Sequence, residues 1–287
     1  MSTVQINELP STASLYGAAA LKRNRQKLRT LPACLVRIDD FSLNCEQLRQ
    51  YTNQFGFNMQ HGVPAPFMYL ATQSTQLYML TRQSFPLSPA GLVHLGIAFD
   101  QTSTISHDWK GTVEMSITNQ QASRKGLLFD IETKFLEAKG SVTLTITSKY
   151  LAKAIKCQSH AEIPNMVSIS EQTPSSRLVQ HPISLDKSSG RRYAKLSGDY
   201  NPIHLYRWSS KLFGFKKPII HGLYMVSEAY SALEKTNNGF ATESAFQFKS
   251  PLYLPGSALL EIHKEDEGPY NIVIAALNKL HLLGRAT

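Results

Sequence analysis

One stretch of the chain, Leu196 to Gly222, carries the side chains best suited to chemistry. It holds a carboxylate, Asp199, and an imidazole, His204, five residues apart. Pro202 lies between them; it fixes its own φ and keeps the residue before it extended, so the loop is held in one shape. Gly222 begins an expected helix, where backbone N–H groups point outward unpaired. A carboxylate–imidazole pair beside such donors is what moving water across an activated carbonyl requires.

Each of these residues also has an ordinary structural explanation. Asp199 taken alone follows a helix end, as solvent-exposed loop aspartates often do, and a lone histidine such as His204 is more often structural than catalytic. Gly222 alone could simply ease the turn into a helix. The pairing of the two side chains across Asn201-Pro202 favours the catalytic interpretation, because catalytic groups need a loop of fixed shape.

Three further residues extend this candidate site. Tyr230 and Ser231 lie two to three turns into the helix expected to begin at His221. Either hydroxyl could face a substrate, although core packing is the better interpretation of Tyr230. His221 could join Asp199 and His204 as a metal ligand, but a fourth ligand of suitable spacing is missing. The sequence therefore predicts neither a metal nor a cofactor.

The elements that position these residues follow from end signals and periodicity. A short helix is expected from Ser188 or Ser189 to Leu196, ended by Gly198, and a longer one begins at His221. Between them, residues 209–213 are expected to form a second short helix. Strands are expected at residues 244–254, 257–264, 270–277 and 280–283.

The first half of the chain repeats this plan in outline. A helix capped by Ser42 or Asn44 is expected to stop at Gly56, and the stretch from Phe67 to Leu80 is hydrophobic nearly all round, as a buried helix is. Strands are expected at residues 33–38, 92–99, 112–118, 127–136 and 142–150. Each half is therefore predicted to be an α+β unit in which an antiparallel sheet wraps one central helix.

Residues 152–187 interrupt this order. They are rich in Pro, Ser and Gln and show little periodicity, so they are expected to be a linker. The predicted division is a basic segment at 1–30, a first repeat at 31–151, the linker, and a second, catalytic repeat at 188–287.

Composition narrows the class of protein. The net charge of +9 favours anionic partners, and part of it lies within eight residues, at Lys22, Arg23, Arg25, Lys27 and Arg29. A transit-like segment or a phosphate-binding face would also account for that cluster, but a solvated basic helix explains it best. Aromatic residues do not interleave with it, which argues against nucleic-acid binding. Without an eighteen-residue apolar run or a signal-peptide core, and with three cysteines, an odd number, the chain is expected to be cytoplasmic and without a membrane span.

The central stretch resembles a known motif. Tyr193 to His204, followed by Gly214-Phe215 and Pro218 to Gly222, is similar to the hydratase-2 motif of MaoC-like (R)-specific enoyl-thioester hydratases and dehydratases. Phe248 to Gly256 resembles the strand that follows the family's central helix. The first half is more loosely similar to the inactive repeat of two-repeat acyl dehydratases, through residues 51–57, 64–80 and 86–94.

The resemblance implies a double hot-dog fold with one active site. Asp199 and His204 would be the acid/base pair, Gly222 the oxyanion donor with His221 beside it, and Asn201 a support for the loop. Some family members place a serine nine residues after the histidine of His-Gly, whereas this chain has Tyr230 there and Ser231 next.

The implied reaction is the reversible hydration of trans-2-enoyl thioesters, carried by coenzyme A or an acyl carrier protein. Two other functions remain open. A hot-dog thioesterase would use a carboxylate on the central helix, here Glu228 or Glu234. A non-catalytic acyl-thioester-binding module would not need the Asp199/His204 loop. Exposed sheet edges also leave a homodimer open.

Overall fold

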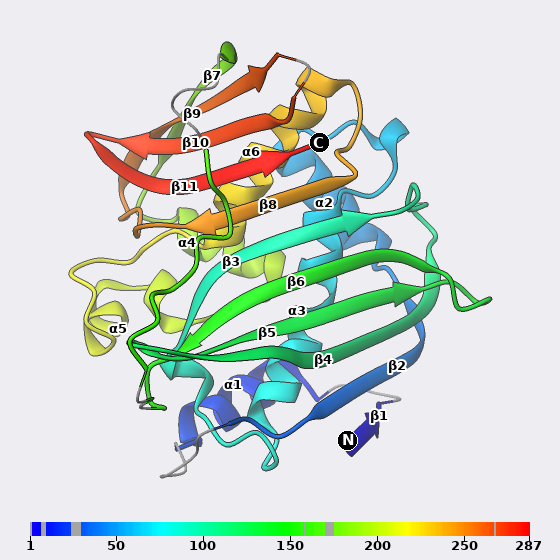
Figure 1. Cartoon of the computed structure of the whole chain (residues 1–287), viewed down its shortest axis with the longest axis vertical. Helices are drawn as coiled ribbons and strands as arrows, with labels where there is room; N and C mark the ends of the chain where they lie inside the picture. Colours follow the sequence, from blue (N-terminus) through cyan, green and yellow to red (C-terminus); the bar gives the residue numbers. More distant parts are fainter. Residues whose placement is uncertain are drawn as a thin grey trace. The chain divides into compact units, whose positions relative to one another are not determined.

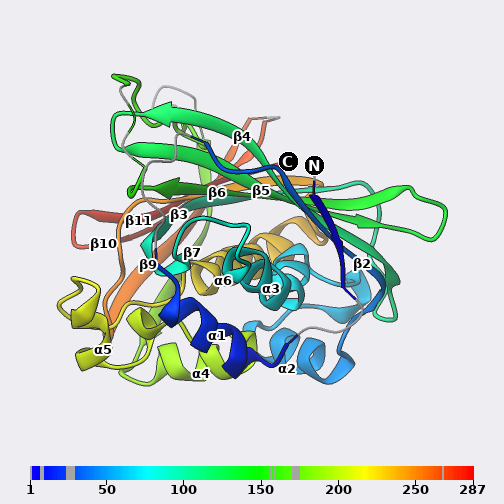
Figure 2. The same cartoon turned by 90° about the horizontal axis from the view of Figure 1, so that it is seen from below.

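The computed structural model describes residues 2–6, 10–23, 30–155, 157, 159–169, 175–266 and 268–287, and within them the chain forms two compact units (Figures 1 and 2). Unit 1 comprises Met1–Leu43 and Ala71–Asn165, and unit 2 comprises Asn44–Leu70 and Met166–Thr287. The basic residues Arg25, Lys27 and Arg29 lie outside the described part. No helix in the described ranges has the length and apolar character needed to span a bilayer.

Unit 1 is built on a sheet with the strand order β1-β2-β4-β5-β6-β3. Its strands are β1 (Ser2–Gln5), β2 (Cys34–Ser42), β3 (Leu92–Gln101), β4 (Lys110–Ser123), β5 (Gly126–Leu136) and β6 (Val142–Ala152). All neighbours pair antiparallel except β1 and β2. Its helices are α1 (Thr12–Leu21) and the second part of α3 (Ala65–Thr81), with a short 3-10 turn η2 (Pro89–Gly91) before β3. Gln76 of α3 donates to the Tyr150 hydroxyl of β6, at 2.5 Å.

Unit 2 is built on an antiparallel sheet with the order β8-β11-β10-β9-β7. Its strands are β7 (Ser175–Leu185), β8 (Glu243–Phe248), β9 (Gly256–Glu265), β10 (Tyr270–Ala276) and β11 (Lys279–Ala286). Apolar side chains alternate along β9 and β10, so that Leu260, Ile262, Ile272 and Ile274 are fully buried on one face.

The long helix α6 (Gly222–Asn237) lies against this sheet and buries Met225, Val226, Ala229 and Leu233. Three more helices belong to the unit, namely α2 (Cys45–Phe55), α4 (Ser189–Ser197) and α5 (Arg207–Leu212), together with the 3-10 turns η1 (Met59–His61) and η3 (Pro202–His204). The Tyr51 hydroxyl of α2 lies 2.6 Å from Ser227 Oγ of α6, and Gln47 of α2 donates to the Leu196 carbonyl of α4. A sheet wrapped around one central helix is the hot-dog arrangement.

The structure differs from the predicted division in two places. Residues 175–185 were expected to be linker, but they form β7 and pair with β9 along its length. Their alternation is hidden because β7 is a mostly exposed edge strand, in which only Ile183 and Leu185 are buried. Residues 44–70, placed by sequence in the first repeat, belong to unit 2. The predicted strand at 244–254 ends earlier, at Phe248.

Candidate active site

Asp199 is positioned by the end of α4. Gly198 takes the left-handed conformation, with φ of 78°, and its N–H bonds to the Ala194 carbonyl. The chain therefore turns sharply off the helix. The Asp199 N–H donates to Ser197 Oγ at 3.1 Å, and the Asn201 N–H donates to Asp199 Oδ1 at 3.1 Å. These two bonds hold the carboxylate in a tight loop while its side chain stays 23% exposed.

His204 ends the 3-10 turn η3 that follows. Asn201 caps this turn, since its side-chain oxygen accepts from the Ile203 N–H. The His204 side chain is buried, and its Nδ1 lies 2.8 Å from the Ile219 carbonyl oxygen. Because a carbonyl can only accept, Nδ1 carries the proton and Nε2 keeps its lone pair. His204 is therefore held in the tautomer that can take a proton at Nε2.

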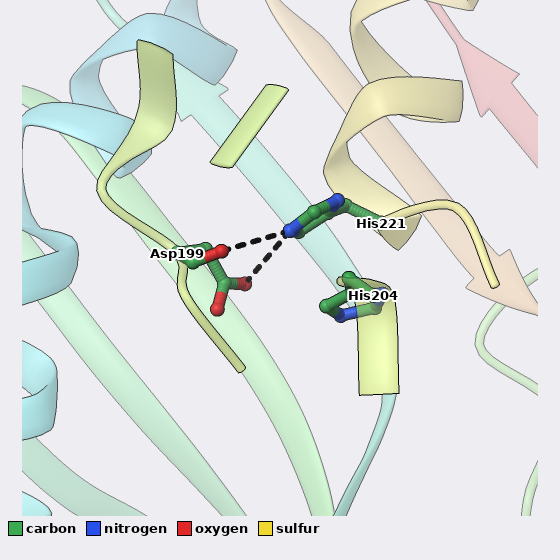
Figure 3. Close-up of side chains that lie close together, drawn as sticks. All are labelled: Asp199, His204 and His221. Carbon is green, nitrogen blue, oxygen red and sulfur yellow. Dashed lines mark hydrogen bonds and ion pairs between the residues drawn. The ribbon is translucent and has the colours of Figure 1, made fainter. Parts of the chain in front are cut away.

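His221 joins the two in space (Figure 3). Its Nε2 donates to the Asp199 backbone carbonyl at 3.0 Å and lies 4.0 Å from Asp199 Oδ2. Its ring stacks on His204, with centroids 3.7 Å apart and planes 25° from parallel. The ring of Tyr193 packs on His221 at 4.8 Å. The structure thus brings Asp199, His204 and His221 into one cluster.

Both imidazoles are neutral at neutral pH. Burial lowers the pKa of His204, and the nearby Asp199 carboxylate opposes this only in part. Burial together with the neighbouring His204 lowers the pKa of His221 to about 3. Burial disfavours a positive charge on either ring, and in the stacked pair a charge on His204 would also disfavour one on His221.

The same three residues offer ligand atoms within 4.8 Å of one another, which raises the question of a metal. His204 Nδ1 and His221 Nε2 are already bonded to carbonyls. The remaining nitrogen of His221, Nδ1, lies on the side of the ring away from Asp199 (Figure 3). A metal at this cluster would have to displace one of these bonds to a carbonyl, so the arrangement fits proton transfer better than metal coordination.

Gly222 occupies the first position of α6, and its N-cap, His221, makes no side-chain hydrogen bond to the first turn. The N–H groups there retain the anion-attracting character of a helix N-terminus. The structure also supplies a packing reason for the glycine. A Cβ at this position would lie 2.7 Å from the ring of Phe248. Loss of activity on Gly222→Ala would therefore not isolate a role for the N–H.

Tyr230 and Ser231 are not brought to this cluster. The Tyr230 hydroxyl donates to the Ala241 carbonyl at 3.4 Å, and Ser231 Oγ donates to the Phe55 carbonyl at 2.7 Å. Both side chains are buried. In this structure their hydroxyls bond to backbone carbonyls within the core of unit 2.

The two carboxylates of α6 differ in environment. Glu234 is 1% exposed and accepts from the Asn58 N–H, with His61 Nδ1 2.8 Å away. Glu228 is partly buried, and this burial raises its pKa despite a hydrogen bond with Tyr224. Glu234 therefore has a structural role, whereas Glu228 remains available for acid/base chemistry.

Sequence reasoning missed two supports of the site. Gly190, inside α4, lets the helix approach the His204 loop, because a Cβ there would lie 2.2 Å from the His204 carbonyl oxygen. Ile219 supplies the carbonyl that orients His204, and its own N–H bonds to Ile203. A glycine inside an expected helix is a signal of close packing, so the role of Gly190 could have been predicted from the sequence. Ile219 acts through its backbone, which leaves no trace in residue type.

Comparison with solved structures identifies proteins of similar fold. HtdX of Mycobacterium tuberculosis has a solved structure that superposes with a TM-score of 0.71, at 21% identity over 88% of this chain and 98% of that one. A MaoC-like dehydratase from Phytophthora capsici gives 0.69, at 19% identity over 90% and 95%. The chain therefore has the hot-dog fold of these enzymes.

The sequence comparisons identify the domain that carries the site. Residues 170–276 match the protein family described as MaoC like domain. A curated relative, 3-hydroxyacyl-thioester dehydratase X of Mycobacterium tuberculosis, is 24% identical over 238 residues, 83% of each chain. Residues 170–276 are thus similar to the MaoC like domain, and Asp199, His204 and His221 all lie inside the matched range.

Proposed function

We propose that this protein interconverts trans-2-enoyl thioesters and (3R)-hydroxyacyl thioesters. The observation that carries the proposal is the neutral, oriented imidazole of His204, with Nδ1 on the Ile219 carbonyl and Nε2 available, in one cluster with Asp199. The name of the curated relative, a 3-hydroxyacyl-thioester dehydratase, supports the same reaction class. The thioester is carried by coenzyme A or an acyl carrier protein, in keeping with the basic charge of the chain.

In hydration, one water lies between Asp199 and His204. His204 Nε2 takes a proton from the water as its oxygen bonds to the β-carbon, and Asp199 accepts the second hydrogen bond of that water. The electron pair of the double bond moves to the thioester oxygen, which the Gly222 N–H stabilises as an enolate. His204 then returns the proton to the α-carbon. Dehydration runs through the same steps in reverse.

The test is a spectrophotometric assay of enoyl-CoA hydration across acyl chain lengths, with the stereochemistry of the product determined. Formation of the (3R)-hydroxyacyl product supports the proposal, and formation of the (3S) product or no hydration at any length contradicts it. Release of free thiol, followed in the same reactions, separates the alternative of a thioesterase. Glu228, with its raised pKa on α6, would be the working carboxylate of that alternative. Glu228→Gln should then abolish thiol release, whereas under our proposal it leaves hydration in place.

A further inference from the structure

Residues 206–217 form a small lobe on unit 2, which we call the 206–217 lobe. It contains α5 and exposes four large apolar side chains to solvent. Trp208 is 69% exposed and Leu212 is 76% exposed, and both Tyr206 and Phe213 are exposed as well. Single exposed apolar side chains are common on protein surfaces, but a cluster of them usually marks an interaction surface.

The outward direction of these side chains is built into the lobe. Ser209 and Ser210 are buried, and Ser209 Oγ donates to the Pro202 carbonyl at 2.7 Å while Ser210 Oγ donates to the Arg207 carbonyl. With this face of α5 turned inward, Trp208 and Leu212 project together from the opposite face, because residues four apart share one side of a helix.

Positive charge surrounds the apolar side chains. Arg207, Lys211, Lys216 and Lys217 are all exposed, and none of the four takes part in an ion pair within the described residues. From residue 200 to residue 227 the sequence contains no Asp or Glu. The lobe is therefore cationic, and an occupant that complements it must be anionic as well as apolar.

We propose that the 206–217 lobe docks unit 2 onto an anionic lipid bilayer. Trp and Leu that project from a small convex element enter the headgroup and acyl boundary, where the indole N–H stays hydrated, and flanking Lys and Arg bind lipid phosphates. In Figures 1 and 2, α5 lies at the outer margin of unit 2, beyond its sheet and central helix. A projecting element of this kind fits a deformable bilayer better than the shape-matched surface of a folded protein.

The lobe is continuous with the candidate active site. Its first residues are held to η3 by the Ser209–Pro202 bond, and the chain leaves it directly before Ile219, whose carbonyl orients His204. Docking through the lobe would place the Asp199–His204 cluster close to a phase in which long acyl chains dissolve. The inference goes beyond the proposed reaction, and vesicle binding measures it without any activity assay.

The chain has an internal probe for this test, since it contains only two tryptophans. Trp109 is buried in unit 1, at 4% exposure, while Trp208 projects from the lobe. Vesicles of phosphatidylcholine and phosphatidylglycerol should shift the emission of the full-length protein to shorter wavelength, and the protein should float with the vesicles. Trp208→Phe keeps an aromatic anchor but removes the probe, so the shift should vanish while flotation persists.

Two double variants separate the apolar and electrostatic contributions. We expect the bound fraction to fall about tenfold for Trp208→Ala with Leu212→Ala, and about tenfold for Lys216→Glu with Lys217→Glu. Matched controls at other exposed positions, Leu277→Ala and Lys125→Glu with Lys139→Glu, should bind like the parent. Near-ultraviolet circular dichroism confirms that each variant is folded.

Four results would overturn the proposal. The first is a parent protein that does not float with anionic vesicles. The second is a lobe variant that binds as well as the matched controls. The third is a wavelength shift that survives Trp208→Phe. Binding to pure phosphatidylcholine vesicles as tight as to anionic ones would also contradict it, because the lysines would then contribute nothing.

Discussion

At the scale of single residues, the candidate site depends on two neutral imidazoles and one carboxylate. His204 uses Nδ1 to bind a carbonyl and His221 uses Nε2, so each ring is held in a defined tautomer by the backbone. In our mechanism His221 does not contact the substrate. It positions Asp199 by a hydrogen bond to the Asp199 backbone carbonyl, and it positions His204 by ring stacking. Substitution of Asp199 or His204 should therefore lower mainly turnover, whereas substitution of His221 should lower mainly the stability of the fold.

The acid/base pair is tested first. Asp199→Asn and His204→Ala should each lower turnover in enoyl-CoA hydration by about 10²–10⁴-fold, the range for loss of general acid/base catalysis. Asn at position 199 can still accept the Asn201 N–H through its side-chain oxygen, so the loop should keep its shape. Circular dichroism and thermal melting provide the control for folding. Near-normal turnover in either folded variant would remove that residue from the mechanism.

The buried histidines also predict an acid-sensitive fold. The pKa of His221 is about 3 in the folded protein and near 6.5 in the unfolded chain, so between these values the unfolded state binds more protons. Its contribution to stability is complete above about pH 6.5 and is lost as pH falls, by up to roughly 1.4 kcal/mol per pH unit. His204, whose pKa is lowered too, acts in the same direction.

The measurement is the free energy of unfolding in urea at several pH values. His221→Asn should be less stable than the parent at pH 7, because the ring packs against Tyr193 and His204. Below pH 6.5 the stability of this variant should fall less steeply than that of the parent. Parallel pH profiles for the two proteins would show that His221 is not held neutral in the fold.

At the scale of elements, α4 packs closely against the η3 turn at Gly190. The closest contact that a side chain at Gly190 would make is with a backbone carbonyl, that of His204. A carbonyl cannot rotate away as a side chain can, so any larger residue must move either the helix or the loop. The position of His204 therefore depends on a residue that touches no substrate.

Gly190→Ala should lower turnover about 10²-fold, as expected when a reacting group is displaced by about an ångström, and should cost about 1–3 kcal/mol of stability. Gly17→Ala in α1 is the matched control, because a Cβ there meets nothing within 4 Å. That substitution should stabilise the protein by about 0.5–1 kcal/mol and leave turnover unchanged. Turnover and urea unfolding of both variants decide the matter; a fully active Gly190→Ala protein would contradict the role given to this glycine.

At the scale of the whole molecule, the two units are unequal in chemistry. Among the described residues, the one group of three His, Cys, Asp or Glu side chains whose ligand atoms all lie within 4.8 Å of one another is Asp199, His204 and His221, in unit 2. The histidine of β3 in unit 1, His94, instead stacks on Tyr150, with ring centroids 4.5 Å apart. We therefore expect unit 1 to take no part in the chemical step.

His94→Ala should leave turnover within about twofold of the parent and lower stability by about 0.5–1.5 kcal/mol, the value of a lost aromatic pair. The comparison with His204→Ala, measured in the same hydration assay, provides the contrast. A drop in turnover similar to that of His204→Ala, in a protein that still folds, would reveal a second catalytic site.

The sequence by itself determined the elements and the motif. The ends of α2 at Asn44 and Gly56 and of α4 at Gly198 follow from local capping, which depends only on neighbouring residues. Most strands of both sheets followed from alternation with turn residues between them, but β1 and β7 did not. Asp199 and His204 were found because they lie five residues apart on one short loop.

Only the tertiary structure decided which partners these pieces take. The amphipathic face of α2 could pack on either sheet, and it belongs to unit 2 because Tyr51 meets Ser227 and the Phe55 carbonyl meets Ser231. The tautomer of His204 depends on a carbonyl fifteen residues away. Tyr230 and Ser231 likewise serve the core, since their hydroxyls find backbone partners there. Apart from the Tyr51–Ser227 pair, these contacts end on a backbone carbonyl, which every residue possesses, so residue type carries no record of that partner.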